Sequence, residues 1–508
     1  MLKSPFQIAN IKYLVWSLCA TLWATVCFLL PDFMDNPIGD FRTFCTIIAY
    51  LAALGAASFF ILYLFGLNRY VAAVFLPVFA LGGATVSYFR VAFHATITPM
   101  VIDATLHTNG GTVAGVVTWP LVVWALVNLL IACGLLFWRW RIVFPNAWAH
   151  ALAILCLWAA FYFGHSRLHM SVNQRYPYNI VSSFVEYTKQ QHSLQQERQT
   201  LPAHAVALPD SIDVVFVLGE AIRADHLSLN GYARPTCPNL QQRDNVVSLP
   251  HIYTPYTYTS LSVPYILSPA DSIHPDWAAS YHSFIHTFKQ YGFRSAWISN
   301  QDNGKTYVSF IHEADTVIFP NASKTSFVFD PWYDEQLLPP LDSQLSHPAA
   351  RNLFVMHTIG SHWYYNNHVP PQHQYFQPLT ANRVITANEP EQVVNSYDNT
   401  VRYMDAFLDS LIGRFESRPA IIIYLSDHGE ALGENGEWLH AGEADALHKP
   451  ACIIWYSDRY AQLFPEHIEA LQHNAAQRYG TDFLYYSVLA AAGLETDSVV
   501  PHLNIFAP

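Results

Sequence analysis

The first third of the chain is marked by five long apolar runs with almost no charged residue, at 13–31, 45–66, 70–89, 116–137 and 147–163. A helix that crosses a bilayer needs roughly 20 apolar residues, with a range of about 17–25. Each run meets that length, the last only just. One such run could be a buried core helix, but five before residue 165 predict a bundle of five transmembrane helices.

The basic residues between the runs predict the topology. One side of the membrane receives Lys3, Lys12, Arg69, Arg139 and Arg141, whereas the other receives Arg42 and Arg90 together with several aspartates. The amino terminus is therefore predicted to be cytoplasmic, and five crossings deliver the rest of the chain outside. The first run is followed by further spans, which argues against a cleaved signal peptide. The Trp-Arg-Trp-Arg stretch 138–141 predicts an interfacial anchor.

One external loop, 90–112, is long and polar and contains Thr108 and Asn109. It can be a solvated connection or a lip that touches a lipid headgroup. We take the second interpretation and predict that Thr108 and Asn109 contribute to substrate binding.

Beyond residue 164 the apolar character is lost, and the segment 165–210 ends in QQHSLQQERQT. This pattern predicts an amphipathic helix on the membrane surface followed by a linker. From residue 211 short apolar strands alternate with polar helical segments, which predicts a parallel sheet with helices on both faces. The predicted domains are thus a membrane domain (1–164), a surface helix and linker (165–210) and a catalytic α/β domain (211–508).

Three predicted strands carry the candidate chemistry: DVVFVLGE (213–220), NLFVMHTIGSH (352–362) and AIIIYLSDHGE (420–430). Each is a continuous apolar run, as expected for a strand covered on both faces. They end in Glu220, in His357 and His362, and in Asp427 and His428. Ligands bind beyond the carboxyl ends of strands in α/β sheets, so these side chains are predicted to form one site.

Glu220, Asp427 and His428 supply two carboxylates and one imidazole, a set suited to Zn²⁺ with one coordination position left open. Mn²⁺ would also tolerate these ligands. Any one acid at a strand end is more often a helix cap. Gly429, however, allows a sharp turn that presents Asp427 and His428 to one ion, and the three residues together favour a metal site.

The segment YTSLSVPYIL (258–267) offers a nucleophile in Thr259, just ahead of a predicted helix. Coordination to a dication would activate its hydroxyl, and backbone N–H groups at the helix start would favour a phosphate. Alternatively Thr259 is only the helix cap, and Ser260 or Ser262 reacts. The residues by themselves leave this choice open.

Composition narrows the function classes further. The formal net charge of −12 argues against a nucleic-acid-binding protein, which would show a basic surface. Of seven cysteines only Cys237 and Cys452 lie outside the apolar runs, so the polar part can form at most one disulfide. The spacing of the cysteines also excludes a zinc ribbon.

Together with the five spans, four motifs resemble the phosphoethanolamine transferases that modify lipopolysaccharide: GEAIRADHLSLNGY (219–232), TSLSVP (259–264), HTIGSH (357–362) and SDHGEALGENGEWLH (426–440). The resemblance covers nearly the whole chain, with the motifs in the family's order. It implies a bacterial inner-membrane enzyme with a periplasmic domain of the alkaline phosphatase and sulfatase fold. Its donor would be phosphatidylethanolamine and its acceptor lipopolysaccharide or lipooligosaccharide.

The resemblance also implies roles for individual residues. Thr259 would be the nucleophile that forms a phospho-threonine intermediate, and Glu220, Asp427 and His428 would join it around one Zn²⁺. The remaining positions would contact the substrate or the transferred group. His362 and His440 would bind a second zinc or the phosphoryl oxygens and carry protons, Lys305 would contact the phosphate, and His357 would bind the substrate.

The chain departs from the lipid A enzymes of this family at two positions. In those enzymes the sequence around the nucleophile follows a pattern like SCGTxTxxSVPC, with a cysteine on each side of the threonine. Here Pro255 and Tyr265 stand at the positions of these two cysteines. Length and motifs look most like the transferases for inner-core heptose of lipooligosaccharide, with lipid A as the alternative acceptor. A glycerol-phosphate polymerase of the lipoteichoic acid type is a further alternative. A sulfatase activity is disfavoured because SVPYI (262–266) lacks the C/S-x-P-x-R context.

Overall fold

A computed structural model gives the fold and describes residues 5–34, 40–93, 97–99, 101–102, 118–143, 147–164, 171–194, 197–301, 307–322, 331–347, 349–382, 385, 388–440, 442–496 and 501–508. The chain forms two compact units, one reaching to Lys189 and the other beginning at Gln190. This boundary lies inside the segment 165–210, for which the sequence predicted a surface helix and a linker.

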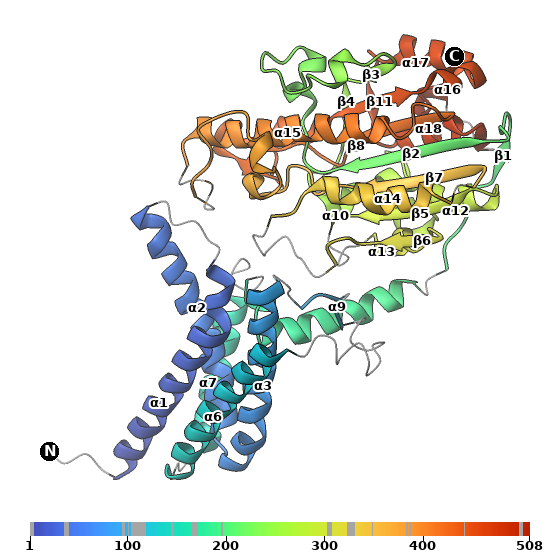
Figure 1. Ribbon diagram of the computed structural model, residues 1–508. Coiled ribbons are helices and arrows are strands. Elements are labelled where there is room, and N and C mark those ends of the chain that lie inside the picture. The colour runs from blue at the N-terminus through green and yellow to red at the C-terminus, as the bar shows by residue number, and fades with distance from the viewer. Residues whose placement is uncertain are drawn as a thin grey trace. The chain divides into compact units, whose positions relative to one another are not determined.

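The first unit is helical, and each predicted apolar run lies on a helix (Figure 1). The helices are α1 (Pro5–Ala24), continued by the π-helix η1 (Thr25–Leu29) and the 3-10 helix η2 (Leu30–Phe33), α2 (Phe41–Gly66), α3 (Arg69–Phe93), α6 (Trp119–Trp140) and α7 (Ala147–Phe163). Among the described residues, four helical stretches are long and apolar enough to cross a membrane. The predicted fifth span is α7, whose 17 residues stand at the lower end of the spanning range.

Arg139 has a structural role that the sequence did not reveal. Its guanidinium donates to the backbone oxygens of Gly66 at 2.5 Å, Leu67 at 2.7 Å and Ile142 at 2.8 Å, and its side chain is buried. Arg139 therefore caps the carboxyl end of α2, where the last carbonyl groups of a helix have no partner within the helix. The neighbouring Trp140 is exposed, and the interfacial anchor at 138–141 stays a prediction.

A helix also occupies the predicted amphipathic segment, α9 (Tyr178–Leu194). Its exposed apolar residues are Ile180, Val181, Phe184 and Val185, which recur at the spacing of one helical face. The buried side includes Ser183, whose hydroxyl donates to the carbonyl of Ile97 at 3.0 Å. The helix thus exposes an apolar stripe on one side and packs with the other.

The second unit is built on a seven-stranded sheet with the order β3-β11-β8-β2-β7-β5-β6. The strands are β3 (Val246–Ser248), β11 (Cys452–Tyr456), β8 (Ala420–Ser426), β2 (Ile212–Gly219), β7 (Arg351–His357), β5 (Arg294–Ser299) and β6 (Thr316–Ile318). The predicted strands at 213–220, 352–362 and 420–430 are the three adjacent central strands β2, β7 and β8. These three pair in parallel, as predicted.

One strand breaks the predicted parallel arrangement. β11 runs antiparallel to both β8 and β3. Among its described residues, the connection from β8 to β11 contains only the short pair β9 (Ala431–Leu432) and β10 (Trp438–Leu439) and two 3-10 turns, η10 (Glu434–Gly436) and η11 (Asp445–His448). A parallel return needs a crossover along the sheet, usually a helix. Without one, the chain re-enters the sheet at the end where it left.

Helices cover both faces of this sheet (Figure 1). On one face α14 (Leu338–Leu345) and α15 (Pro390–Ile412) pack against side chains such as Val215 and Ile422. The other face, which includes Phe216, is covered by α10 (Thr259–Leu267), α12 (Phe284–Gln290), α16 (Asp458–Leu463), α17 (Pro465–Asn474) and α18 (Phe483–Ala491). Burial on both faces explains why β2, β7 and β8 read as continuous apolar runs.

Small elements complete this unit, and the two cysteines outside the apolar runs stay unpaired. β1 (Ala203–Ala205) pairs with β13 (Leu494–Thr496), and β4 (Ile252–Tyr253) pairs with β12 (Tyr479–Gly480). The shortest helices are α11 (Trp277–Ser280) and α13 (Val308–Ile311). Cys237 and Cys452 are buried free thiols. They belong to the cores on opposite faces of the sheet, so they form no disulfide.

Candidate active site and metal centre

The candidate site lies where three neighbouring parallel strands end. The register pairs Gly219 of β2 with Ser426 of β8, and Leu218 of β2 with His357 of β7. Glu220 and Asp427 therefore follow directly at the carboxyl ends of adjacent strands. The parallel register brings together side chains that are more than 200 residues apart in the chain.

Glu220 is the centre of a buried set of contacts. Its Oε2 accepts hydrogen bonds from the Thr259 hydroxyl at 3.0 Å and from the Gln301 amide at 2.9 Å. Its Oε1 lies 3.4 Å from Nε2 of His428. The Gln301 amide also donates to the carbonyl of Thr358 at 3.1 Å, which fixes its orientation. Gln301 thus positions Glu220, a role that the sequence analysis missed.

Thr259 is the first residue of α10, and its side chain is 6% exposed. The amino end of a helix carries partial positive charge and unpaired N–H groups, which favour an anion such as phosphate. Ser262, one of the alternative nucleophiles, is fully buried and donates its hydroxyl to the carbonyl of Tyr256 at 3.2 Å. Of the two side chains, Thr259 is the one whose hydroxyl points to Glu220.

Asp427 and His428 are both fully buried. Oδ1 of Asp427 accepts from the backbone N–H of Ala221 at 3.2 Å and of His428 at 2.9 Å, and burial raises the pKa of Asp427 to about 6. Nδ1 of His428 lies 2.7 Å from the carbonyl of Gly429, and burial lowers the pKa of this imidazole. A proton on Nδ1 leaves Nε2 as the nitrogen with a lone pair, which is the tautomer of a metal ligand.

These groups fit a metal ion. Within the described part of the chain, Oδ2 of Asp427 and Nε2 of His428 are buried polar atoms without a hydrogen-bond partner, 3.4 Å apart. Ligand atoms of Glu220, His428 and His440 lie within 4.8 Å of one another. Buried carboxylates are costly unless a cation offsets their charge, and carboxylate with imidazole is a zinc-binding set. The structure thus adds His440 to the neighbourhood of the predicted ligands.

His440 and His362 lie beside this centre as a row of imidazoles. The ring centroid of His440 is 5.0 Å from that of His428 and 5.9 Å from that of His362. Nδ1 of His440 lies 3.3 Å from the buried carboxylate of Glu430, which also accepts from the Tyr365 hydroxyl at 2.8 Å. Burial alone would lower the pKa of His440, but the hydrogen bond and the charge of Glu430 raise it to about 9.

The structure does not place His357 with this group. Its ring is fully buried, with centroids 5.7 Å from Trp297 and 5.6 Å from Tyr307. A ring enclosed in this way packs against the core, and the substrate contact of His357 stays a prediction. The other predicted substrate-binding residues, Thr108, Asn109 and Lys305, lie outside the described residues.

The HTIGSH segment folds over Glu220 through a glycine that no other residue replaces easily. Gly360 has a φ of +51°, and a Cβ there would lie 2.6 Å from the Glu220 carbonyl oxygen. Asp334 holds this turn, because its carboxylate accepts from the backbone N–H of Ile359 at 2.8 Å and of Gly360 at 3.0 Å. Burial raises the pKa of Asp334 to about 6. This turn leads directly to His362.

Two family models match the chain. The sulfatase model covers residues 212–494, which is more than half of the 508 residues. The model described as phosphoethanolamine transferase EptA/EptB covers residues 54–192 of the membrane part. Among curated relatives, phosphoethanolamine transferase EptA of Salmonella typhimurium is 28% identical, covering 98% of this chain and 97% of its own.

Solved structures show the same fold. The integral membrane protein lipooligosaccharide phosphoethanolamine transferase A from Neisseria meningitidis matches with a TM-score of 0.54 at 22% identity, over 97% of this chain and 98% of its own. The zinc complex of the C-terminal periplasmic domain of EptC from Escherichia coli matches with a TM-score of 0.56 at 23% identity, over 61% of this chain and 90% of that domain. The predicted combination of membrane helices with a sulfatase-like domain is confirmed.

Proposed function

Because the chain belongs to the sulfatase family, and to the phosphoethanolamine transferases within it, we propose that it transfers phosphoethanolamine from phosphatidylethanolamine to lipopolysaccharide. The observation that carries the proposal is the hydrogen bond from the Thr259 hydroxyl to Glu220, at the amino end of α10 and beside a buried acid and two imidazoles. A hydroxyl, a metal-binding set and an anion-binding helix end meet at one point. Acting together, they suit phosphoryl transfer.

Glu220, Asp427, His428 and the Thr259 hydroxyl are the groups that would hold a zinc ion, with His440 within reach. Bound there, zinc would supply positive charge that favours loss of the hydroxyl proton and offsets charge on the phosphoryl oxygens. Mn²⁺ is the less suitable ion for a site with an imidazole and a small set of ligands. His362 and His440 would take a second ion or the phosphoryl oxygens themselves.

The reaction is proposed to run in two displacements. In the first, the Thr259 hydroxyl loses its proton, Oγ1 forms a bond to phosphorus, the bond from phosphorus to the diacylglycerol oxygen breaks, and that oxygen gains a proton. In the second, an acceptor hydroxyl loses its proton and forms a bond to phosphorus, the bond from phosphorus to Oγ1 breaks, and Oγ1 regains a proton. The amino end of α10 binds the phosphoryl oxygens, and His362 or His440 carries the proton.

For the acceptor we propose an inner-core heptose, with lipid A as the alternative. The loss of both cysteines found around the nucleophile in lipid A enzymes, at Pro255 and Tyr265, supports a different acceptor. We further propose that the protein lies in the inner membrane with its catalytic unit in the periplasm. The apolar helices and the distribution of basic residues support this location.

The proposal is tested by the intact mass of the full-length protein after incubation with phosphatidylethanolamine in detergent. We expect one added phosphoethanolamine on the wild type and on Ser262→Ala, and none on Thr259→Ala. Phosphatidylglycerol serves as the control donor and should add no mass. An adduct that survives in Thr259→Ala, or a glycerol-phosphate adduct from phosphatidylglycerol, would contradict the proposal.

A further inference from the structure

Four residues form a contiguous surface of arginines and aromatic rings, which we call the arginine–aromatic surface: Arg234, Phe376, Tyr375 and Arg402. The guanidinium of Arg234 lies 5.3 Å from the ring centroid of Phe376, and that of Arg402 lies 4.2 Å from the centroid of Tyr375. The two rings meet edge to face with centroids 5.0 Å apart. Tyr375 is 60% exposed, so its ring is open to a ligand.

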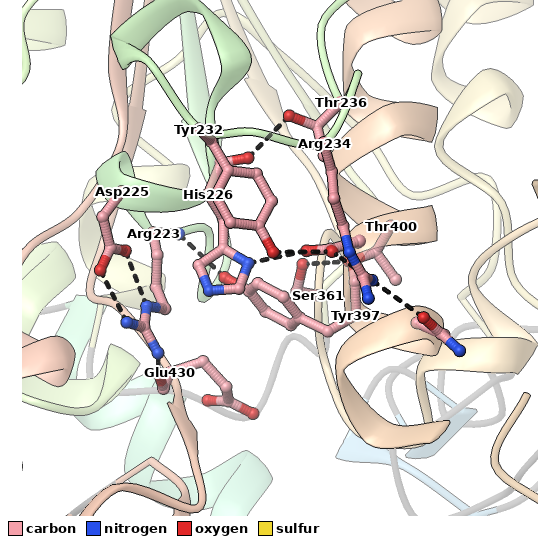
Figure 2. A network of polar contacts seen from close by, with 12 residues as sticks. Arg223, Asp225, His226, Tyr232, Arg234, Thr236, Ser361, Tyr397, Thr400 and Glu430 are labelled. Carbon is pink, nitrogen blue, oxygen red and sulfur yellow. Dashed lines mark hydrogen bonds and ion pairs between the residues drawn. The ribbon is translucent and has the colours of Figure 1, made fainter. Parts of the chain in front are cut away.

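Arg234 of this surface belongs to a network of polar contacts that also contains Tyr397 of α15 (Figure 2). Buried Asp398 accepts from Arg234 at 2.9 Å and lies 2.7 Å from Nδ1 of His226. One residue earlier, the Tyr397 hydroxyl donates to the carbonyl of Ala221, next to Glu220, at 2.7 Å. The same turn of α15 therefore fixes both the arginine and the end of β2.

The segment after β7 also connects the active site with the arginine–aromatic surface. It leaves the site at His362, and the Tyr365 hydroxyl binds Glu430, the partner of His440. At its far end, Asn399 of α15 accepts from the backbone N–H of Phe376 at 2.7 Å and donates to its carbonyl at 2.9 Å. The backbone of Phe376 is thus held against α15, the helix whose Tyr397 also contacts the end of β2.

The charge of this surface contrasts with that of the chain, which has a formal net charge of −12. Arg402 donates to the neutral carbonyl of Pro235, and within the described residues it forms no ion pair, so it keeps its charge for a ligand. Arg234 shares Asp398 with the hydroxyl of Tyr232 and with His226. A guanidinium recognises phosphate through paired hydrogen bonds, and a fixed aromatic ring offers an apolar face at a low entropic cost.

We propose that the arginine–aromatic surface binds the phosphorylated core glycan of the acceptor, with sugar rings against Tyr375 and Phe376 and core phosphate at Arg402 and Arg234. The inference rests on the proposed function and names the acceptor part that the site would recognise. The surface calls for an anionic glycan, because the arginines favour a negatively charged group and the exposed aromatic rings favour a sugar ring. It also gives a physical reason for a core sugar, rather than the lipid part, to reach Thr259.

The test separates the two half-reactions of the full-length protein in detergent. Release of diacylglycerol from phosphatidylethanolamine without acceptor reports the first step, and transfer to purified lipopolysaccharide reports the second. For Tyr375→Ala combined with Arg402→Gln, we expect the KM for lipopolysaccharide to rise about tenfold or more. Diacylglycerol release should stay within about twofold of the wild type.

Matched variants keep the test specific. Tyr375→Phe retains the ring and should behave as the wild type, and so should Arg414→Gln, which removes a half-buried arginine paired with Asp342. Lipopolysaccharide stripped of its core phosphates should abolish the effect of Arg402→Gln while leaving that of Tyr375→Ala. An unchanged KM in the double variant, or an equal loss in both half-reactions, would overturn the inference. A wild type that releases no diacylglycerol would instead overturn the proposed function beneath it.

Discussion

A single carboxylate oxygen of Glu220 accepts two hydrogen bonds, one from Thr259 and one from Gln301. Gln301 contributes no charge, but it decides how the carboxylate is turned. The Gln301 amide also donates to the carbonyl of Thr358, and this second hydrogen bond fixes the orientation of the Gln301 side chain. Residues that orient metal ligands in this way typically contribute 10–100-fold to metal affinity or activity.

Replacement of Gln301 by Leu, which has a similar volume, should therefore lower zinc affinity and the rate of diacylglycerol release by about 10–100-fold. Competition with a chelator measures the first quantity, and single-turnover assays measure the second. Gln242→Leu is the matched control, since Gln242 is exposed and donates only to the carbonyl of Pro238. Wild-type zinc affinity in Gln301→Leu would show that Glu220 needs no support.

His467 predicts a pH dependence of stability at a place remote from the metal ligands. Its ring stacks on Phe464 with centroids 4.8 Å apart, and burial lowers the pKa of His467 to about 4. The unfolded chain protonates this histidine near pH 6.5, so between these values the unfolded state binds more protons. Acidification from pH 6.5 to about 4 therefore destabilises the folded protein.

The effect should amount to about 1–3 kcal/mol, because each unit of pKa shift corresponds to about 1.4 kcal/mol and partial exposure reduces it. Thermal unfolding in detergent at pH 7 and pH 5 measures the difference. In His467→Gln the fall in Tm on acidification should be smaller than in the wild type. His473→Gln, at an exposed position of the same helix, should not change it. Equal falls in all three proteins would contradict the assignment.

At the scale of residues, the sequence predicted that Glu220, Thr259, Asp427 and His428 belong to one site. This was possible because the pattern of apolar and polar residues indicates where strands end and helices begin. It could not separate Thr259 from Ser262, since both lie near the start of one helix and only their side-chain partners distinguish them. The structure also gives a different reason for a glycine at position 429 from the sharp turn that the sequence predicted. Its φ is not positive, but a Cβ there would lie 2.1 Å from the carbonyl oxygen of Ala446.

Among the elements, α10 is fixed without a disulfide. Tyr265, at a position where the lipid A enzymes have cysteine, packs edge to face on Tyr256 with centroids 5.4 Å apart. Its hydroxyl donates to Asp482 at 3.1 Å. Tyr256 in turn accepts from Ser262 through its carbonyl. These contacts join the two ends of the segment around the nucleophile, as a covalent link would.

Reductant should consequently leave the protein unaffected, because all seven cysteines are free. Thermal unfolding and diacylglycerol release should be the same with and without dithiothreitol. Tyr265→Ala should destabilise the protein by about 3–5 kcal/mol, the usual cost of truncating a large buried aromatic side chain. Tyr265→Phe should cost only about 1 kcal/mol, since it keeps the ring and loses one hydrogen bond. A drop in Tm with dithiothreitol would indicate a covalent link instead.

The strands and helices were more predictable than their directions. Apolar runs located β2, β7, β8 and the five membrane-part helices, because burial on two faces or in lipid leaves a local signature. The antiparallel direction of β11 left no such signature, because its five apolar residues would read the same in a parallel or an antiparallel strand. The cap by Arg139 was also invisible, because its partners, Gly66 and Leu67, are over 70 residues away.

At the scale of the whole molecule, the proposed reaction requires the catalytic unit to reach a donor that is held in a bilayer. Two acyl chains hold the donor in the membrane, at about 0.8 kcal/mol per buried CH₂. The protein must therefore meet the headgroup at the membrane surface. The apolar stripe of α9, with Val181 66% and Phe184 48% exposed, is suited to that surface.

Val181→Asp combined with Phe184→Asp should therefore slow diacylglycerol release from phosphatidylethanolamine in vesicles by about tenfold, since burial of one such side chain contributes about 1.5–3 kcal/mol. With the same donor dispersed in detergent, the rate should stay within about twofold, because the headgroup is then reached without a bilayer surface. Glu186→Gln, on the same helix, is the control and should leave both rates unchanged. Equal loss in vesicles and detergent would mean that the stripe stabilises the fold. No loss in either would mean that the apolar helices of the first unit suffice to bring the site to its donor.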